Sequence, residues 1–191
     1  MLKSKNNFKL SICIPNYNRS KYLNNCLNSI FLAKSISSLT FEICISDNGS
    51  KDNILSIVNY YKKKGLIINY KSNNKNLGFG ANFYKVVKMA KGEFIWVIGN
   101  DDLLYMSTLK KLDKLFFKNK DVDFFFINSA SLNSKFVFKH KQPFNTKKIP
   151  QNLSSFSKIK QNKKTKFFNL INPSVSWDFM LGIFLTIYKR E

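Results

Sequence analysis

Two adjacent carboxylates, Asp101 and Asp102, follow the apolar run 94–99 after a single residue and are the side chains of this sequence best suited to chemistry. The run carries no charge and is rich in aromatic and β-branched residues, which is typical of a strand buried on both faces of a parallel sheet. Ligands bind at the carboxyl edge of such sheets, so the pair could hold Mg²⁺ or Mn²⁺ through oxygen. The alternative is that Asn100 and the pair only form a turn and cap the next helix.

Strands and helices alternate through the first 128 residues. Apolar runs predict strands at 9–15, 41–46, 66–70, 94–99 and 123–128. Apolar residues spaced three and four apart predict helices at 22–32, 52–63, 82–90 and 107–117. Ser50 is the expected N-cap of the second helix. This alternation predicts βαβ units with right-handed crossovers, and therefore an α/β fold with a mainly parallel sheet.

The pattern changes after residue 128. The stretch 129–172 is rich in Lys, Asn, Ser and Gln and has no sustained periodicity, which predicts irregular structure. The run 177–189 is apolar enough to be buried, and the sequence stops two residues later. We therefore expect one domain, with a regular core at 1–128, a less regular part at 129–191, and a chain that is cut short at its C-terminus.

Composition limits the partners and the compartment. The net charge of +21 predicts attraction to a phosphate-rich partner, either an anionic membrane face or nucleic acid, although an AT-rich genome would also favour lysine. The lysines are scattered and form no nucleic-acid motif, so we expect no specific nucleic acid. No apolar run reaches the ~20 residues of a membrane helix, which predicts a cytoplasmic protein. The three cysteines lack metal or redox spacing and are expected to be buried thiols.

Four short motifs stand in order at the ends of predicted strands. They are Pro15-Asn16-Tyr17-Asn18-Arg19, Ser46-Asp47-Asn48-Gly49-Ser50, Asn76-Leu77-Gly78 with Asn82, and Gly92-Glu93-Phe94 leading to Asp101-Asp102. In this order they resemble the family 2 glycosyltransferases of the GT-A fold. The second motif and the run 97–102 are most similar to abequosyltransferase-type enzymes, which build bacterial surface polysaccharides. The resemblance implies a mainly parallel sheet with helices on both faces, and a nucleotide-sugar-binding core at 1–128 followed by the start of an acceptor-side part.

The resemblance also implies a nucleotide site around the first two motifs. Pro15, Tyr17, Asn18 and Arg19 would cradle the nucleotide, with Tyr17 near the base ring. Asp47 would accept the N3 hydrogen of uracil or thymine, which favours a UDP- or dTDP-sugar because cytosine has an acceptor there. The alternatives are core packing for Tyr17 and an Asx-turn for Asp47.

The later motifs would complete the donor site. Asn76, Gly78 and Asn82 would shape the wall near the ribose and diphosphate, unless Asn82 is only a helix cap. Asp102 would bind Mn²⁺ or Mg²⁺, and Asp101 would share the metal or the ribose hydroxyls.

The sequence departs from the family pattern in two places. Gly99 and Asn100 stand where acidic residues are common, which predicts weaker metal affinity. The segment that carries the general base of inverting members is not seen, and Asp178 is the candidate in its place. The implied activity is transfer of a sugar, with inversion, from a nucleotide-sugar to a surface-polysaccharide or lipid-linked glycan. The alternatives are a non-catalytic nucleotide-sugar-binding remnant without its base, and a basic nucleic-acid-binding protein.

Overall fold

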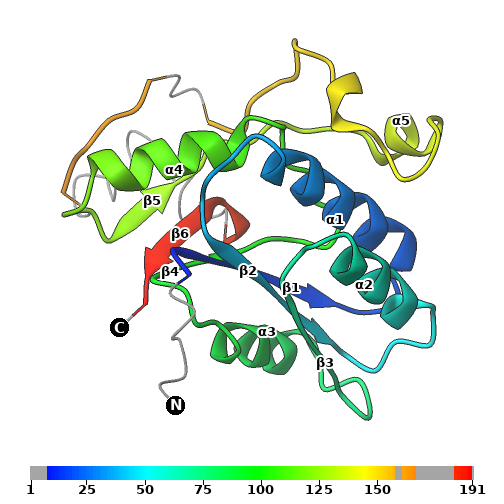
Figure 1. The fold of residues 1–191 in the computed structure, drawn as a ribbon. Coiled ribbons are helices and arrows are strands. Elements are labelled where there is room, and N and C mark those ends of the chain that lie inside the picture. The colour runs from blue at the N-terminus through cyan, green and yellow to red at the C-terminus, as the bar shows by residue number, and fades with distance from the viewer. Residues whose placement is uncertain (1–7, 158–160, 167–182, 191) are drawn as a thin grey trace.

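The computed structural model describes residues 8–157, 161–166 and 183–190, which build a six-stranded sheet between helices (Figure 1). The strands are β1 (Leu10–Asn16), β2 (Phe41–Asp47), β3 (Ile68–Ser72), β4 (Phe94–Val97), β5 (Phe124–Phe126) and β6 (Thr186–Lys189). The helices are α1 (Ser20–Lys34), α2 (Ile54–Lys63), α3 (Phe79–Lys88), α4 (Thr108–Lys118) and α5 (Ser134–Phe138). Short 3₁₀ turns cover Thr146–Lys148 and Ile183–Leu185. These bounds agree with the nine elements expected from the sequence to within a few residues.

The sheet is mainly parallel, as predicted, and its strand order is β3-β2-β1-β4-β6-β5. Strands β3, β2, β1 and β4 pair in parallel, and the register places Asn16 of β1 opposite Asp47 of β2 at the carboxyl edge. Strand β6, from the end of the chain, pairs antiparallel with both β4 and β5 and separates them. The sequence predicted that this run is buried, but its position between β4 and β5 is decided by tertiary pairing.

Helices cover both faces of the sheet, because side chains alternate along each buried strand. Ile12 and Ile14 belong to the large apolar cluster that includes α1, α2 and α4, whereas Cys13 belongs to a smaller cluster with Val86 of α3. Figure 1 shows α3 alone on its side of the sheet, with the other long helices opposite. The three cysteines are free and buried, as expected.

The stretch 129–172, expected to be irregular, contains one short helix and a packed apolar cluster in its first part. Residues 134–138 form α5, and Val137, Phe144 and Ile149 form a separate apolar cluster. Two side chains of α1 fix this segment, because Asn28 donates to the Phe144 carbonyl (2.9 Å) and Asn25 accepts from the Phe144 N–H (2.8 Å). Isolated aromatic residues can pack together without any periodicity in sequence, so pattern analysis does not detect such a cluster.

The predicted N-cap of α2 was also wrong. Helix α2 begins at Ile54 after Asn53, and Ser50 lies too far upstream to cap it. The Ser50 hydroxyl instead donates to Asp47 and accepts from the Asn18 N–H (2.8 Å), so it joins the loops after β1 and β2. Within the described residues, no helix is both long and apolar enough to cross a membrane.

Candidate functional site

Asn82 ties helix α3 to the carboxyl ends of β1 and β2. Its amide nitrogen donates to the carbonyls of Asn16 (3.4 Å) and Ser46 (3.0 Å). Its amide oxygen accepts from the Ser46 hydroxyl (2.7 Å) and from the Asn73 amide (3.2 Å). The side chain is buried and uses both donors and both lone pairs. Asn82 is not the cap of α3, since that position is Gly78.

Asp47 is buried at the same edge, with 2% of its surface exposed, and its carboxylate accepts from four protein donors. Two of them, the Asn16 amide (3.3 Å) and the Ser50 hydroxyl, donate to Oδ1. The Tyr70 hydroxyl (3.1 Å) and the Ser72 hydroxyl (3.3 Å) donate to Oδ2. A carboxylate offers about four acceptor positions, so the protein itself occupies those of Asp47.

The loop before α3 is organised by Asn48, which the sequence analysis did not single out. The Asn48 amide donates to Asn76 Oδ1 (2.7 Å) and to the Gly78 carbonyl (3.2 Å), and its oxygen accepts from the Leu77 N–H (2.9 Å). Gly78 has φ of +83°, a left-handed conformation that favours glycine. The position of Asn48 directly after Asp47, at the end of a strand, was the signal that could have identified this residue.

The loop after β1 carries the other expected nucleotide contacts. Pro15 lies within β1, opposite Ser46 of β2. Asn18 Oδ1 accepts from the Lys51 N–H (2.9 Å) and thereby holds this loop against the loop after β2. Tyr17 is 41% exposed, so the alternative that it is core packing is wrong.

The carboxylates of Asp101 and Asp102 converge above Gly99. A Cβ atom on Gly99 would lie 2.7 Å from Asp101 Oδ1 and 3.1 Å from Asp102 Oδ2. The Gly99 N–H donates to Asp102 Oδ2 (2.6 Å), and Arg19 Nη1 donates to Asp101 Oδ2 (2.9 Å). Asn100 and Asp101 form a turn that the Asp102 N–H closes by donating to the Gly99 carbonyl (3.2 Å), as the alternative interpretation held, but the pair does not cap α4, whose N-cap is Ser107.

The electrostatics at Asp102 are set first by desolvation and, to a smaller extent, by the like charge of Asp101. Desolvation raises the pKa of the Asp102 carboxyl, the hydrogen bond from Gly99 opposes this, and the charge of Asp101 raises the pKa further. A cation beside both carboxylates would relieve this repulsion.

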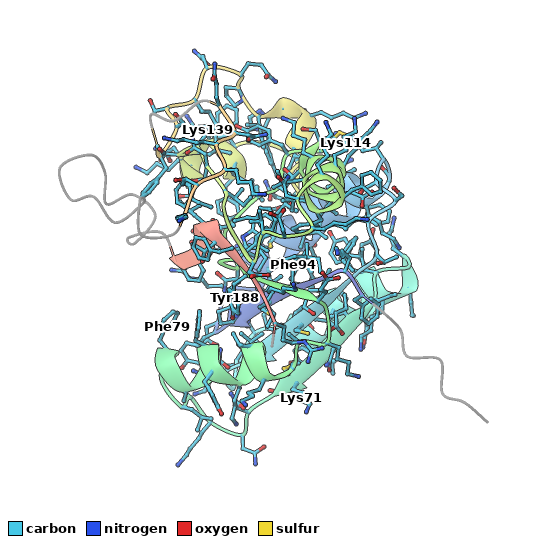
Figure 2. All side chains as sticks on the ribbon, turned by 90° about the vertical axis from the view of Figure 1, so that its left-hand side faces the viewer. Lys71, Phe79, Phe94, Lys114, Lys139 and Tyr188 are labelled. Atoms are coloured by element: carbon cyan, nitrogen blue, oxygen red, sulfur yellow. The ribbon has the colours of Figure 1, made fainter. Side chains whose placement is uncertain are left out.

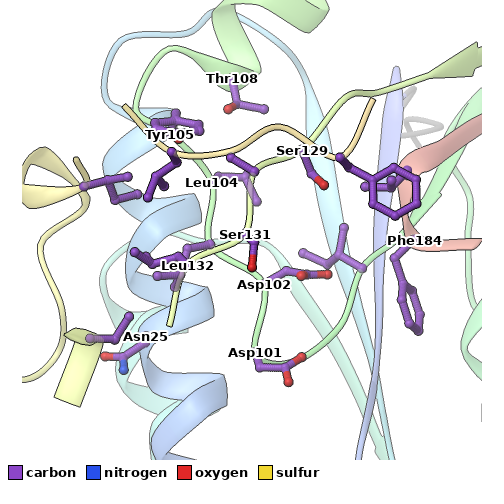
Figure 3. Close-up of a pocket in the computed structure, with 18 of the residues that line it drawn as sticks. Asn25, Asp101, Asp102, Leu104, Tyr105, Thr108, Ser129, Ser131, Leu132 and Phe184 are labelled. Carbon is purple, nitrogen blue, oxygen red and sulfur yellow. The ribbon is translucent and has the colours of Figure 1, made fainter. Parts of the chain in front are cut away.

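A cavity of about 640 Å³ opens beside the pair (Figure 3). Arg19, Asp101 and Asp102 line it, together with the loop 103–105 and residues 127–132 after β5. The expected nucleotide contacts that do not line it are Pro15, Tyr17, Asn18, Asp47, Asn76, Gly78 and Asn82. Asp178 lies outside the described residues. The structure therefore divides the predicted site into a network over β1 and β2 and a carboxylate pair at the cavity.

Several polar residues of the cavity were missed from the sequence. Ser129 and Ser131 face it from the segment after β5, Tyr105 from the stretch between β4 and α4, and Thr108 from the first residue of α4 (Figure 3). The only available signal was their position after predicted strands, because carboxyl ends of parallel strands meet at one edge.

The pair suits a hard divalent cation that also binds phosphate. Among the described residues, no group of three or more His, Cys, Asp or Glu side chains could enclose a metal by itself. Mg²⁺ is commonly held by one or two carboxylates together with substrate phosphates and water. Asp101 and Asp102 could supply the two carboxylates.

A sequence model described as glycosyl transferase family 2 matches residues 11–186. The chain belongs to this family. It is 37% identical over 114 residues to the abequosyltransferase RfbV of Salmonella typhimurium, an alignment that covers 59% of this chain and 34% of that protein. The resemblance found in the motifs is confirmed.

Solved structures confirm the GT-A fold. Residues 1–349 of TarS from S. aureus, in complex with UDP-GlcNAc, align with a TM-score of 0.59 and 28% identity over 66% of this family 2 chain and 36% of that one. The mannosyltransferase PcManGT of Pyrobaculum calidifontis, in complex with GDP-Man and Mn²⁺, aligns with a TM-score of 0.53 and 16% identity over 70% of this chain and 38% of that one. This chain thus spans about a third of RfbV and of the TarS structure.

Proposed function

We propose that this family 2 chain binds a nucleotide-sugar and a divalent cation and transfers the sugar, with inversion, to a surface-polysaccharide or lipid-linked glycan. The observation that carries the proposal is the convergence of Asp101 and Asp102 beside Arg19 at the mouth of the cavity. Two carboxylates and a guanidinium at the carboxyl edge of parallel strands can together hold a cation and a diphosphate.

The nucleotide would lie over the ends of β1 and β2, where Tyr17 is exposed and Asp47 lies below. We propose that the base contacts Asp47 and that the donor is a UDP- or dTDP-sugar, which is supported by the UDP-GlcNAc complex of TarS. The base N3–H would then replace one of the two longest bonds to Asp47, those from Asn16 and Ser72, both 3.3 Å.

Asp102, with Asp101, would hold Mn²⁺ or Mg²⁺, which supplies charge stabilisation to the leaving diphosphate. Arg19 already pairs with Asp101, and both side chains are about half exposed, so the guanidinium can exchange this partner for a phosphate oxygen at little cost. The Mn²⁺ of PcManGT supports a divalent cation in this fold.

The cavity beside the pair would receive the sugar and the acceptor. Among the described residues, Asp101 and Asp102 are the only acids that line it, so we propose that the general base lies elsewhere, with Asp178 as the candidate. We also propose that the protein works at the cytoplasmic face of an anionic membrane, where lipid-linked acceptors are present.

Titration calorimetry tests the donor part of the proposal. UDP should bind more tightly with Mn²⁺ than with EDTA, because the cation links the carboxylate pair to phosphates that it otherwise repels. ADP is the matched control, since it carries the same diphosphate and a different base. Equal affinity for UDP with and without metal would contradict the metal site. Binding of a UDP-sugar with no release of UDP, in the presence of lipid-linked or polysaccharide acceptors, would favour the non-catalytic remnant.

A further inference from the structure

The outer face of α3 carries exposed lysines and lies in a stretch of the chain without acidic residues. Residues 53–92, which include α3, contain eight lysines and no Asp or Glu. By contrast, Asp113 lies on α4, and Asp121 and Asp123 follow it closely. We define the α3 face by the exposed residues that project from α3 and from the adjacent edge strand β3 and loop; they are Lys71, Lys75, Phe79, Tyr84, Lys85 and Lys88.

Two exposed aromatic side chains lie on α3: Tyr84 stands among the lysines, and Phe79 lies at the rim of the face beside the half-buried Phe83, with ring centroids 5.9 Å apart. Phe79 and Tyr84 are each 62% exposed. Lys88 lies over the Tyr84 ring, with Nζ 5.5 Å from the centroid, so charge and aromatic surface are adjacent. Aromatic side chains among lysines are the composition of helices that lie in the headgroup region of a bilayer.

Lys71 extends the face beyond the helix. Ile68 and Tyr70 of β3 pack into the cluster on the opposite side of the sheet, and side chains alternate along a strand, so Lys71 points to the α3 side. Figure 2 shows Lys71 and Phe79 on the α3 side of the molecule, with Lys114 and Lys139 on the other. No other described long helix covers this side of the sheet, so the described part of the chain leaves the outer face of α3 uncovered (Figure 1).

The position of α3 relates this face to the donor site. Helix α3 begins at Phe79, directly after Gly78, and Asn82 fixes its first turn to the carboxyl ends of β1 and β2. Phe79 therefore marks the end of the α3 face that is nearest to the edge proposed to bind the nucleotide-sugar.

We infer that the α3 face docks on an anionic lipid bilayer, with Phe79 and Tyr84 inserted among the headgroups and the lysines paired with lipid phosphates. Charge complementarity selects this partner, because a lysine-rich surface free of carboxylates is attracted to anionic headgroups. Docking by this face brings the carboxyl edge of the sheet close to the membrane. The inference rests on the proposed function in one respect: docking would give the protein access to a lipid-linked acceptor.

Vesicle sedimentation tests the inference. The protein should bind vesicles that contain phosphatidylglycerol, bind phosphatidylcholine vesicles weakly, and lose binding at high salt. The double variant Lys71→Gln/Lys88→Gln should bind the anionic vesicles about 25-fold more weakly, since each lysine near such a surface contributes about fivefold. The matched control is Lys110→Gln/Lys111→Gln on α4, which removes the same charge from another exposed surface and should cost much less.

The aromatic pair is tested in the same way. Phe79→Ala/Tyr84→Ala should weaken binding by about fivefold or more, because apolar area leaves the interface, whereas Phe117→Ala on α4, at a residue that is 76% exposed, should not.

Equal losses for the α3 and α4 variants would overturn the inference and leave only non-specific attraction. Self-association that depends on Phe79 and Tyr84 without vesicle binding would assign the face to a second copy. UDP binding, measured in parallel, should be unchanged in all four variants, so a failure of docking is distinguishable from a failure of the donor site.

Discussion

The two halves of the carboxyl edge are both rich in polar side chains, yet they differ in how those side chains are satisfied. Over β1 and β2, Asp47 and Asn82 are buried and each makes four hydrogen bonds within the protein. Beyond β4, Asp101 and Asp102 lie close together at a cavity and are accessible at its surface, although the surrounding protein partly desolvates the Asp102 carboxyl.

This difference separates residues that hold the edge together from residues that can accept a ligand. Buried polar groups that are fully paired stabilise a single arrangement, and removing one leaves its partners unsatisfied. Two like charges that converge at a cavity gain most when a cation arrives. The following predictions test whether the two halves really differ in this way.

The largest effect is expected in the buried half. Asn82→Ala removes the side chain that joins α3 to β1 and β2, so the free energy of unfolding should fall by about 3 kcal/mol. Urea denaturation measures this value. Asn74→Ala, at an exposed residue of the neighbouring loop, is the control and should change little. Unchanged stability of Asn82→Ala together with lost UDP binding would make Asn82 a ligand contact instead.

The next effect is expected in the open half. Asp102→Asn should weaken Mn²⁺-dependent UDP binding by about 100-fold, because even residues behind a metal ligand typically contribute 10- to 100-fold. The circular dichroism spectrum should not change. Asp123→Asn, which removes an exposed carboxylate just before β5, is the control for net charge. If UDP still binds more tightly with Mn²⁺ than with EDTA, the pair does not hold the cation.

Asp47 belongs to the buried half, but it is also the residue proposed to contact the base of the nucleotide. If Asp47 accepts from uracil, Asp47→Asn should reduce the preference for UDP over CDP by about 1 to 2 kcal/mol, the scale of a hydrogen bond to a charged group. Calorimetry with both nucleotides measures the preference, and a stability measurement shows how far the network is disturbed. An unchanged preference with lower stability would assign Asp47 wholly to the framework.

The smallest effect tests the geometry of the carboxylate pair alone. Gly99→Ala keeps both charges, but its Cβ would lie 2.7 Å from Asp101 Oδ1 and push that carboxylate away. UDP binding with Mn²⁺ should weaken by about fivefold, because ligand positions matter to a cation with strict geometry. Gly80→Ala is the control, since its Cβ would meet no atom within 4 Å. Equal binding by both variants would show that the convergence over Gly99 has no role.

Much of this fold follows from local sequence patterns. The alternation of apolar runs and helical periodicity predicted β1 to β4 and α1 to α4, because burial of one face is a local requirement on each element. The motifs at strand ends also placed Arg19, Asp101 and Asp102 at the carboxyl edge of the sheet, and in the structure all three line one cavity.

Only the tertiary structure decided which of these polar residues remain available to bind a ligand. Two of the donors that occupy Asp47, Tyr70 and Ser72, come from β3, which reaches Asp47 only because β3 pairs beside β2. The cavity depends likewise on α5 and on the segment after β5, whose aromatic and polar residues have no period in the sequence. A sequence pattern predicts whether each helix or strand is buried or exposed. Whether the acceptor positions of a carboxylate are all occupied depends on donors that strand pairing brings from elsewhere in the chain.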